Sequence, residues 1–477
     1  MKIKFLPLIA VLFAATSIMT SCLDNDVEQI TYTSETSITG FSLGTLNIVR
    51  MGKDKNGLDS PYVDTLDCSN YPFTIDQINR TITNKDSLPV GTHIDKVITS
   101  ITYDAGMLAY KPKGSDNDTI WTSTDSIDFT DPVEFKVYAY SGVEGKPYTI
   151  TINVHKQEPD TISWKKFDTQ LFNAGNLSEQ KAVYANGKVY VFGKNGNGTH
   201  IEYSDVANDN PSPWVPVTDK IPSNIDTYSA TAWAGNIYFL AGGTNDKQLY
   251  KLSVTTDEIE PVGTETFEVL IGGNDTKEEL YAVINKISNG VSNSVSHTYK
   301  NGVWTEDANP FTLFPAGKPF FSNTTTASYN SDITTTIALC NSTTANDTAA
   351  LVFNRISSDN KWEERMQNLP LPNLENVTMI YYDGKLYAFG GGYKEIKPFS
   401  QFYCSTDNGL CWRPVTECMA FPAEFSELYT AHSKNYSCAV TPKLESETSR
   451  GNFIWIVWED GSICRGRINR LGFTPKW

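Results

Sequence analysis

VTMIYYDGKLYAFGGG, from Val377 to Gly392, is one of three clear copies of a unit that recurs along this chain. The other two copies are QKAVYANGKVYVFG, from Gln180 to Gly193, and YSATAWAGNIYFLAGG, from Tyr228 to Gly243. Each copy has the pattern of a β-hairpin, and a third strand and a usually Trp-marked fourth strand follow it. Units of roughly fifty residues recur in this way between Asp160 and Trp477. Repetition at this period, with four strands per unit, predicts a β-propeller.

The layout predicts six blades, the last of which is completed by a strand that precedes the first hairpin. The first hairpins are expected near residues 180–193, 228–243, 267–285, 327–341, 377–392 and 437–460. The last unit ends without a Trp-marked fourth strand, whereas Trp164 lies in a short strand pattern ahead of all the hairpins. Because pairing of the chain ends removes exposed sheet edges, we expect residues 160–167 to close a propeller that spans 160–477. A ring of five or seven blades is the alternative.

Composition and charge indicate a globular, strand-rich protein and argue against one class of partner. The 477 residues are enough for two domains, and 40% of them are hydrophobic. The 24 Tyr and 23 Phe residues favour strands. The formal net charge is −16, and an acidic surface repels phosphate groups. We therefore expect no nucleic-acid partner.

Residues 1–21 have the pattern of a lipoprotein signal peptide that ends before Cys22. Two lysines precede an apolar run from Phe5 to Ala15, which is too short for an anchoring transmembrane helix. The sequence MTSC (19–22) resembles the lipobox of bacterial lipoproteins, in which the cysteine becomes the acylated N-terminus. The resemblance implies that Cys22 is acylated and attaches the chain to a membrane. Ordinary secretion with an incidental cysteine is the alternative.

The segment after Cys22 reads as an acidic tether over residues 22–29. Acidic residues directly after the cysteine resemble the surface-export signal of Bacteroidetes lipoproteins. This resemblance implies an outer-membrane lipoprotein that is exposed on the cell surface. The alternative is a solvated tether on a protein that faces the periplasm.

Residues 30–157 are expected to form a separate β-sandwich domain with an immunoglobulin-like architecture. Residues 148–155 alternate between apolar and polar side chains, as in a strand with one buried face, and 135–139 alternate in the same way. A turn rich in Gly and Pro separates the two runs, which favours a hairpin of a sandwich. The match is to architecture alone, because no Cys–Trp–Cys frame of a true immunoglobulin domain is present. The polar segment 156–160 is the expected domain junction.

Two motifs of the repeats resemble those of known propeller families. The hairpins that end in Tyr-x-φ-x-Gly-Gly, near Gly243 and Gly391, and the Trp of the fourth strand resemble kelch repeats. Gly at these positions lets the chain leave the second strand where a Cβ would collide with the next blade. The Gly pair of the third unit, Gly272-Gly273, is expected in a hairpin turn instead. This resemblance implies a kelch-like fold, but it implies no enzymatic activity.

The sequence STDNGLCW, from Ser405 to Trp412, matches S-x-D-x-G-x-x-W, the Asp-box of sialidase-type propellers. In that family the box is a structural turn between the third and fourth strands of a blade. We expect Asp407 to accept backbone N–H groups across the turn, Gly409 to supply a positive φ, and Trp412 to anchor the turn. One such box supports the fold but not glycosidase activity.

The distribution of Arg and His residues argues against the enzymes that use this fold. A sialidase clamps a carboxylate with three arginines, but no Arg lies between Arg80 and Arg355. The propeller histidines at 200, 297 and 432 are scattered, and no C-x-x-C pair occurs. We therefore expect no catalytic residues, no metal and no cofactor. A glycan-active hydrolase or lyase stays open as the second hypothesis.

Two long connections between units are candidates for a ligand-binding surface. They span Asp307–Ser328 and Thr416–Ser437, and connections of this kind open on one face of a propeller. Aromatic side chains concentrated on one face suggest a surface for a sugar or a protein. The candidate residues are Phe311, Phe314, Phe320, Phe321, Phe421, Phe425 and Tyr429. The alternative is that these rings cap the propeller core or pack on the sandwich domain.

The lipobox, a small β domain containing NKDSLPVGT (84–92) and a kelch-like propeller together resemble a Bacteroidetes lipoprotein family of unknown function. The family brings no catalytic residues to this chain. Our first hypothesis is a non-catalytic, lipid-anchored cell-envelope protein that binds a glycan or an envelope protein through the propeller loops. The other hypotheses are a glycan-active enzyme and a structural component of an outer-membrane assembly.

Overall fold

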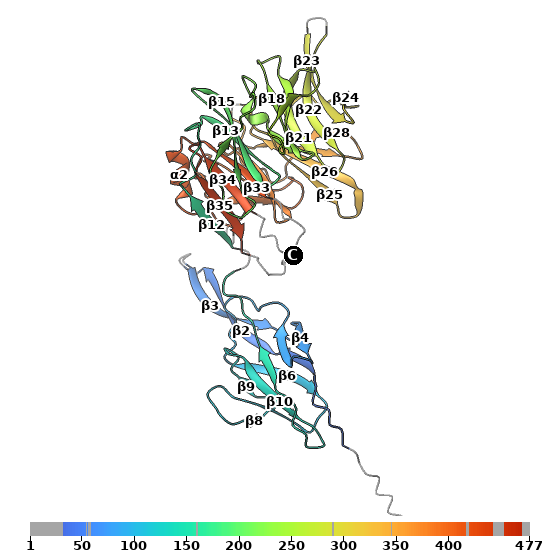
Figure 1. Ribbon diagram of the computed structural model, residues 1–477, viewed down its shortest axis with the longest axis vertical. Helices are drawn as coiled ribbons and strands as arrows, with labels where there is room; N and C mark the ends of the chain where they lie inside the picture. Colours follow the sequence, from blue (N-terminus) through green and yellow to red (C-terminus); the bar gives the residue numbers. More distant parts are fainter. Residues whose placement is uncertain are drawn as a thin grey trace, which may run out of the picture. The chain divides into compact units, whose positions relative to one another are not determined.

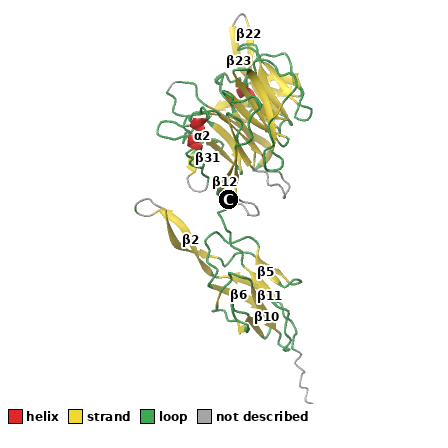
Figure 2. Cartoon of the chain, turned by 60° about the vertical axis from the view of Figure 1, so that its left-hand side comes forward, coloured by secondary structure: helices red, strands yellow, loops and turns green. Residues whose placement is uncertain are grey.

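The computed structural model describes residues 32–53, 55, 59–158, 161–288, 291–344, 346–415, 419–441 and 453–469. Cys22 and the acidic tether lie outside these residues. The chain divides into two compact units, Met1–Lys156 and Gln157–Trp477. Strands dominate both units, and the helical segments among the described residues are α2 (Phe425–Ala431) and the short 3₁₀ turn η1 (Thr227–Ser229) (Figure 2). In the described part of the chain, no helix is long and apolar enough to cross a membrane.

In the N-terminal unit, the described residues form two sheets and a separate hairpin. The three-stranded sheet has the order β1 (Ile38–Leu43), β6 (Val97–Tyr103), β9 (Ser126–Ile127). The six-stranded sheet has the order β4 (Phe73–Asp76), β5 (Thr81–Asn84), β11 (Tyr148–Thr151), β10 (Val133–Tyr138), β7 (Met107–Tyr110), β8 (Thr119–Ile120). The hairpin pairs β2 (Thr45–Lys53) with β3 (Asp59–Asp67).

The alternation of apolar and polar residues places one face of each sheet in a shared core. Along β10, Val133, Phe135 and Val137 are buried between more exposed neighbours. Tyr148 and Ile150 of β11 do the same, and they join one hydrophobic cluster with residues of β1 and β6. The N-terminal unit is therefore an all-β domain with a single core.

The described residues of the C-terminal unit form six four-stranded antiparallel sheets, here named sheets 1 to 6 in chain order. Sheets 1 and 2 comprise β13 (Glu179–Ala185), β14 (Lys188–Asn195), β15 (Gly198–Asp205), β16 (Val215–Pro216) and β17 (Thr231–Trp233), β18 (Asn236–Ala241), β19 (Gln248–Leu252), β20 (Ile259–Pro261). Sheets 3 and 4 comprise β21 (Phe267–Asn274), β22 (Glu279–Ser288), β23 (Val291–Lys300), β24 (Val303–Glu306) and β25 (Phe321–Ala327), β26 (Asn330–Cys340), β27 (Leu351–Ile356), β28 (Lys361–Glu364). Sheets 5 and 6 comprise β29 (Thr378–Tyr382), β30 (Lys385–Phe389), β31 (Phe402–Ser405), β32 (Arg413–Val415) and β33 (Tyr436–Thr441), β34 (Phe453–Trp458), β35 (Ile463–Ile468), β12 (Ile162–Phe167).

The first strands of the sheets follow one another around a common centre (Figure 1). Each of these strands contacts the first strand of the next sheet, and β33 of sheet 6 contacts β13 of sheet 1. Neighbouring sheets enclose the second strand of each sheet on both faces, so its side chains are buried. All six residues of β34, the second strand of sheet 6, are buried. The C-terminal unit is a β-propeller domain.

β12 joins the two ends of the propeller by pairing with β35. The antiparallel register runs from Ile162 opposite Ile468 to Phe167 opposite Ile463. Trp164 lies opposite Gly466, where a Cβ would come within 2.7 Å of the indole ring. Gly466 therefore leaves the space in which Trp164 packs across the strand.

Two details of the predicted layout are wrong in sheets 3 and 4. Gly272 and Gly273 were expected in a hairpin turn, but they lie inside β21, where the register shifts between Leu270 and Gly272. A Cβ on Gly272 would lie 1.8 Å from the Ser322 hydroxyl of the neighbouring sheet, so the bulge permits close packing of two sheets. The first hairpin of sheet 4 also begins at Phe321, six residues before the predicted start at 327.

Candidate functional site

The topology of the sheets brings two sets of connections to one end of the propeller. In a four-stranded antiparallel sheet, the loop between the second and third strands and the link to the next sheet leave from the same end. We call this end the loop face. Two cavities on it, in and beside sheet 1, are lined by polar side chains that the sequence analysis did not select.

The larger of these cavities is a groove of about 540 Å³, here named the sheet 1–2 groove. It lies between the second–third strand loops of sheets 1 and 2 and the link that joins these sheets. Its charged and aromatic lining residues are Glu179, Lys194, Asp226, Tyr228 and Lys247. The groove therefore presents donors and acceptors of both charge signs beside one aromatic ring.

Asp226 and Lys247 form a fixed ion pair in the sheet 1–2 groove. Lys247 Nζ lies 2.6 Å from Asp226 Oδ2, and the two side chains are 17% and 19% exposed. The Asp226 backbone N–H donates to Leu240 O at 2.9 Å, which ties the link to β18. Each charged group is thus oriented by the other, and Lys247 Nζ also donates to Glu268 O at 3.4 Å.

The second cavity, here named the axial cavity, lies at the centre of the ring and has a volume of about 30 Å³. Residues at the beginnings of β13, β25, β29 and β33 line it, together with residues of four links between sheets. The lining residues include Gln180, Lys181, Tyr228, Phe321, Tyr436 and Ser437. Tyr228 lines both the axial cavity and the sheet 1–2 groove, so the two cavities are neighbours.

Lys181 is a buried lysine on the loop face. Its Nζ donates to Tyr228 O and to Phe320 O, both at 2.9 Å, and only 7% of the residue is exposed. Phe320 directly precedes sheet 4, so the side chain of Lys181 bridges sheet 1 and the link before sheet 4. Burial lowers the pKa of Lys181 to about 7, although the nearby Asp226 carboxylate opposes the shift. Within the described residues, Lys181 forms no ion pair.

Two polar atoms beside Lys181 are buried and have no hydrogen-bond partner among the described residues. They are Oε1 of Gln180 and Oγ of Ser437. The amide nitrogen of Gln180 is occupied, because it donates to Val457 O at 2.7 Å. Tyr436 is satisfied as well, since its hydroxyl donates to Asn376 O at 2.8 Å. The unused hydrogen-bonding capacity of the cavity therefore belongs to Gln180, Lys181 and Ser437.

The aromatic residues predicted as a contact surface lie mainly in the core. Five of them are buried and two are half-buried: Phe314, Phe320, Phe421, Phe425 and Tyr429 are the buried ones, and Phe311 and Phe321 the half-buried ones. Phe314 packs 4.7 Å from Phe353 in a core shared by sheets 3 and 4. The rings fill the ends of the cores between sheets, as in the alternative reading, and they do not form an exposed aromatic surface.

Phe421 and α2 show how the second long loop achieves this packing. The Phe421 ring stacks on Phe402 of β31 with the centroids 4.0 Å apart, and it also lies 5.4 Å from Trp164 of β12. α2 buries Phe425 and Tyr429 on its inner side. Residues 416–418 of this loop lie outside the described residues.

The turn from Ser405 to Trp412 lies between β31 and β32 and is closed by its own side chains. Asp407 Oδ1 accepts hydrogen bonds from Ser405 Oγ at 2.8 Å and from the Cys411 N–H at 2.9 Å. Burial alone would raise the pKa of Asp407, but these hydrogen bonds lower it below its usual value. Gly409 has a φ of +83°, and Trp412 is fully buried. The turn is a structural element, and none of its groups faces either cavity.

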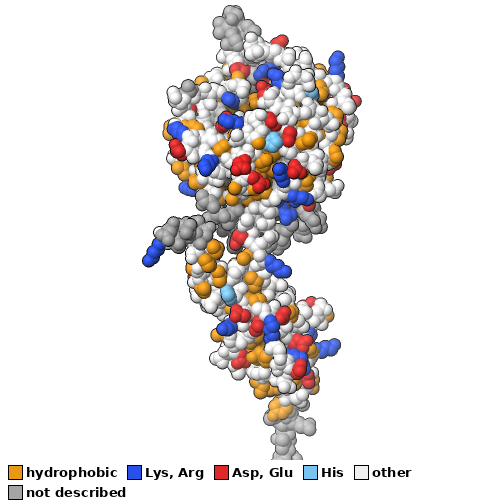
Figure 3. All heavy atoms as spheres, turned by 90° about the vertical axis from the view of Figure 1, so that its left-hand side faces the viewer, with side chains coloured by type: hydrophobic (Ala, Val, Ile, Leu, Met, Phe, Trp, Pro, Cys, Tyr) orange, Lys and Arg blue, Asp and Glu red, His pale blue; other side chains and the backbone are white. Residues whose placement is uncertain are grey.

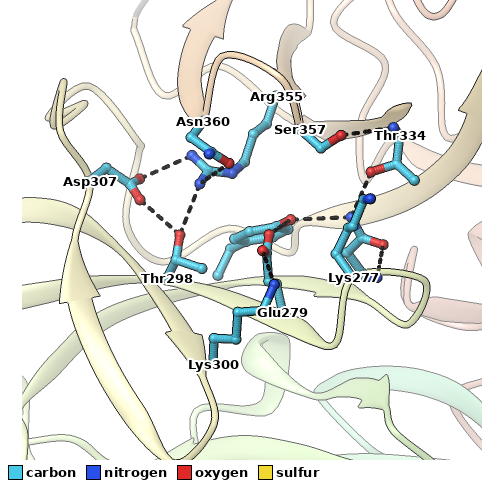
Figure 4. A network of polar contacts seen from close by, with 11 residues as sticks. Lys277, Glu279, Thr298, Lys300, Asp307, Thr334, Arg355, Ser357 and Asn360 are labelled. Carbon is cyan, nitrogen blue, oxygen red and sulfur yellow. Dashed lines mark hydrogen bonds and ion pairs between the residues drawn. The ribbon is translucent and has the colours of Figure 1, made fainter. Parts of the chain in front are cut away.

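A buried polar network between sheets 3 and 4 is structural rather than a candidate site (Figure 4). Asp307 Oδ2 lies 3.4 Å from Arg355 Nη1, and their side chains are 2% and 3% exposed. Thr298 Oγ1 accepts from Arg355 and donates to Asp307. Figure 4 shows these three residues converging from two sheets. Arg355 is therefore committed to joining the sheets and is not available as a carboxylate clamp for a ligand.

The described residues contain no group of three or more His, Cys, Asp or Glu side chains placed to hold a metal ion. On the face shown in Figure 3, acidic and basic side chains are interspersed rather than gathered by sign. The sheet 1–2 groove and the axial cavity are polar sites on the loop face of the propeller. Sequence reasoning missed them, although Gln180 and Lys181 were visible as a polar pair at the start of an otherwise apolar inner strand.

Fold and site together define a two-domain all-β protein whose propeller carries polar cavities on its loop face. The model of the DUF6242 beta propeller domain matches residues 158–476, and that of the DUF6242 N-terminal domain, a domain of unknown function, matches residues 41–152. The chain belongs to the DUF6242 family. No curated protein matches it.

Solved structures with a similar fold share little sequence with this chain. An α-L-arabinanase of Penicillium chrysogenum complexed with arabinobiose is 9% identical, with 64% of this chain and 96% of the other covered and a TM-score of 0.37. A Bacteroides thetaiotaomicron protein of unknown function is 11% identical, with 83% and 98% covered and a TM-score of 0.33. The SapL1 lectin in complex with α-methyl fucoside is 13% identical, with 60% and 89% covered and a TM-score of 0.34. Likenesses at these scores carry no argument about function.

Proposed function

We propose that this protein binds an oligosaccharide on the loop face of its propeller, in the sheet 1–2 groove. The observation that carries the proposal is a concave groove of about 540 Å³ whose lining combines a fixed ion pair with an aromatic ring. A concave site of this size suits a ligand of a few sugar units, whereas a protein partner is met on a broader and flatter surface.

The lining chemistry supports a sugar as the ligand. Sugar hydroxyls both donate and accept hydrogen bonds, and Asp226 and Lys247 offer one acceptor and one donor at fixed positions. Because each side chain already holds the other, little conformational entropy is lost when a ligand binds. The Tyr228 ring offers an apolar surface for the C–H face of a sugar ring.

A glycan array probed with the full chain in mild detergent tests this proposal. We expect binding to at least one oligosaccharide class and a loss of roughly tenfold or more in affinity for the Asp226→Ala and Lys247→Ala variants. The matched controls are Lys286→Ala and Glu306→Ala, which break an exposed ion pair of sheet 3 with a 2.8 Å contact. Binding that survives the groove changes, or that falls equally with the control changes, would overturn the proposal.

Glycan hydrolysis is the second candidate, because two carboxylates, Glu179 and Asp226, line the same groove. Hydrolases place a pair of carboxylic acids on either side of the scissile bond. Incubation of the bound oligosaccharide with the protein, followed by product analysis, separates the two functions. Products that disappear in the Glu179→Gln variant would replace the binding function by an enzymatic one.

We also propose that acylation of Cys22 anchors the chain to the outer membrane, with the propeller exposed at the cell surface. The lipobox at 19–22 and the acidic segment after it support this proposal. Growth with an alkyne-labelled fatty acid should label the wild-type chain but not the Cys22→Ser variant. Protease treatment of intact cells then distinguishes surface exposure, in which the chain is cleaved, from a periplasm-facing chain, which is protected.

We infer for the architecture that the six sheets are six blades of one closed propeller, and that the N-terminal unit is an immunoglobulin-like sandwich that acts as a spacer. The ring of contacts among the first strands and the pairing of β12 with β35 support the blade count. The Ser405–Trp412 turn, with its bonds to Asp407, supports its assignment as an Asp-box. Experimental structure determination of the chain tests all three inferences.

A further inference from the structure

We propose that the axial cavity recognises a carboxylate group, so that the oligosaccharide is an acidic one. This inference rests on the proposed function, because it names the class of sugar bound at the loop face. In this proposal, a subsite for the acidic group is formed by Lys181, Ser437 and Gln180.

Lys181 is a buried cation without a carboxylate partner among the described residues. Buried ammonium groups of proteins are normally paired with a carboxylate, because removing a charge from water is costly. Lys181 is 7% exposed, and in the described part of the chain it bonds to two backbone carbonyls but to no carboxylate. The nearby Asp226 carboxylate is already paired with Lys247. A ligand carboxylate would supply the missing partner.

The same cavity also leaves part of its hydrogen-bonding capacity unused. An ammonium group has three donors, and carbonyl oxygens occupy two of those of Lys181. Ser437 Oγ and Gln180 Oε1 are buried without partners among the described residues. The oxygens of a carboxylate can accept from Lys181 and from the Ser437 hydroxyl. A hydroxyl next to the carboxylate, as in a uronic acid, can donate to Gln180 Oε1.

The axial cavity adjoins the groove, and the linings of the two cavities together are more basic than the chain as a whole. Tyr228 lines both spaces, so a sugar in the groove lies beside the axial cavity. Three lysines line the two cavities (181, 194 and 247), against two carboxylates (179 and 226). The whole chain carries a formal charge of −16, so this local excess of lysine is opposite in sign to the global charge.

The test compares two copies of one glycan array, the second with all carboxyl groups converted to methyl esters. Esterification removes the charge and keeps the shape of each sugar almost unchanged. The full chain in mild detergent should bind acidic oligosaccharides and lose roughly tenfold or more of its affinity on the esterified copy. An equal affinity for the acids and their esters would overturn the inference.

Two variants separate the role of Lys181 in ligand binding from its structural role. Lys181→Gln keeps two N–H donors for the backbone carbonyls but lacks the charge, so we expect it to remain folded by circular dichroism and to bind acids and esters alike. Ser437→Ala should weaken the preference for acids in the same direction. The matched control is Lys220→Gln, which removes an exposed lysine from the link between sheets 1 and 2 and should keep the preference.

The outcomes of these experiments distinguish a failure of the carboxylate subsite from a failure of the proposed glycan binding in the groove. If neutral glycans bind and acidic ones show no advantage, the carboxylate subsite is wrong and the groove proposal stands. If Lys181→Gln retains the preference for acids, the subsite lies elsewhere and the inference fails. If no glycan binds in either array, both proposals fail.

Discussion

Lys181 shows how a single side chain can be costly for the fold and useful for binding. Its ammonium group is held between Tyr228 O and Phe320 O, and burial lowers its pKa to about 7. In the unfolded chain a lysine has a pKa of about 10.4. The folded state therefore binds fewer protons than the unfolded state between about pH 7 and pH 10.4.

This difference predicts a pH dependence of stability that Lys181 controls. Stability rises with pH where the unfolded state binds more protons, so the destabilisation by Lys181 is complete below about pH 7 and is relieved as the pH rises towards 10. The free energy of unfolding, measured with urea at pH 6.5 and 9.5, should increase more for the wild type than for Lys181→Gln. The expected difference is on the order of a few kcal/mol.

The other titratable groups near Lys181 make the comparison between variants necessary. They are Asp226, Tyr228, Tyr436 and Cys438. Burial raises the pKa of Tyr228 to about 12 and raises that of Cys438, and the thiol destabilises the fold at high pH because it ionises more easily when unfolded. Since both proteins share these groups, the difference reports Lys181. An equal pH dependence of stability in the wild type and in Lys181→Gln would contradict a buried ammonium group at Lys181.

Gly409 gives a second prediction at the level of one residue. It has a φ of +83°, and a Cβ added there would lie 2.8 Å from Val352 of sheet 4. Gly384 in the β29–β30 turn has a φ of +76° but open space around its Cα. Both Gly→Ala variants carry the conformational cost of a positive φ, so Gly409→Ala should lose about 1–3 kcal/mol more than Gly384→Ala in thermal or urea unfolding. Equal losses would mean that Gly409 is not packed against the neighbouring sheet.

The sequence could predict some of these residues and not others, for a physical reason. The roles of Asp407 and Gly409 depend on bonds within eight residues, so a local motif carries them. The partners of Lys181 are backbone carbonyls 47 and 139 residues away in the sequence. A polar pair at the start of an apolar strand signals that such partners exist, but no local pattern identifies them.

Among the elements, β12 has the largest consequence for the architecture. It pairs with β35 over six residues, and Trp164 donates through Nε1 to Ala420 O at 2.9 Å. The Trp164 ring also lies 4.9 Å from that of Phe425 in α2. One strand from the beginning of the propeller is thereby bound to two segments from its end.

Removal of the Trp164 ring should therefore loosen the closure of the propeller. We expect Trp164→Ala to lower the free energy of unfolding by about 2–4 kcal/mol, since a large half-buried ring and a hydrogen bond are lost. Lys166→Ala, at an exposed position of the same strand, is the control and should change it by less than about 0.5 kcal/mol. Urea unfolding followed by tryptophan fluorescence and circular dichroism measures both. A small effect of Trp164→Ala would show that β12 does not close the ring.

The contact between sheets 3 and 4 offers a test of the buried ion pair. Asp307→Ala leaves the Arg355 guanidinium buried and unpaired, which should cost about 3–5 kcal/mol. The double variant Asp307→Ala/Arg355→Met removes both charges and should recover much of that loss. Thermal unfolding of the single and double variants measures the coupling. Additive losses would contradict a direct interaction between the two residues.

Element boundaries were predicted well where the pattern is local and poorly where neighbouring sheets decide them. The hairpin of sheet 1 was expected near 180–193 and forms β13 and β14. The bulge at Gly272 was not expected, because its cause is the Ser322 side chain of another sheet. The loop aromatics were misread as a surface for the same reason, since the cores that bury Phe314 and Phe421 are built by distant segments.

For the whole molecule, the propeller supplies a rigid frame on which the loop face holds its polar groups. The axial cavity is lined by the first strands of sheets 1, 4, 5 and 6, and the groove by the loops of sheets 1 and 2. The fold could be predicted from the repeat, whereas the site could not, because it exists only where several repeats meet and where their sequences differ.

Hydrogen–deuterium exchange of the full chain, with and without the best-binding oligosaccharide from the array, tests the central claim most directly. Bound sugar should slow exchange in the segments that line the groove, around residues 223–228 and 242–247, and around β13. The outer strands β16 and β20 and the N-terminal unit should exchange at unchanged rates. Protection confined to the N-terminal unit or to the opposite end of the propeller would contradict a binding site on the loop face.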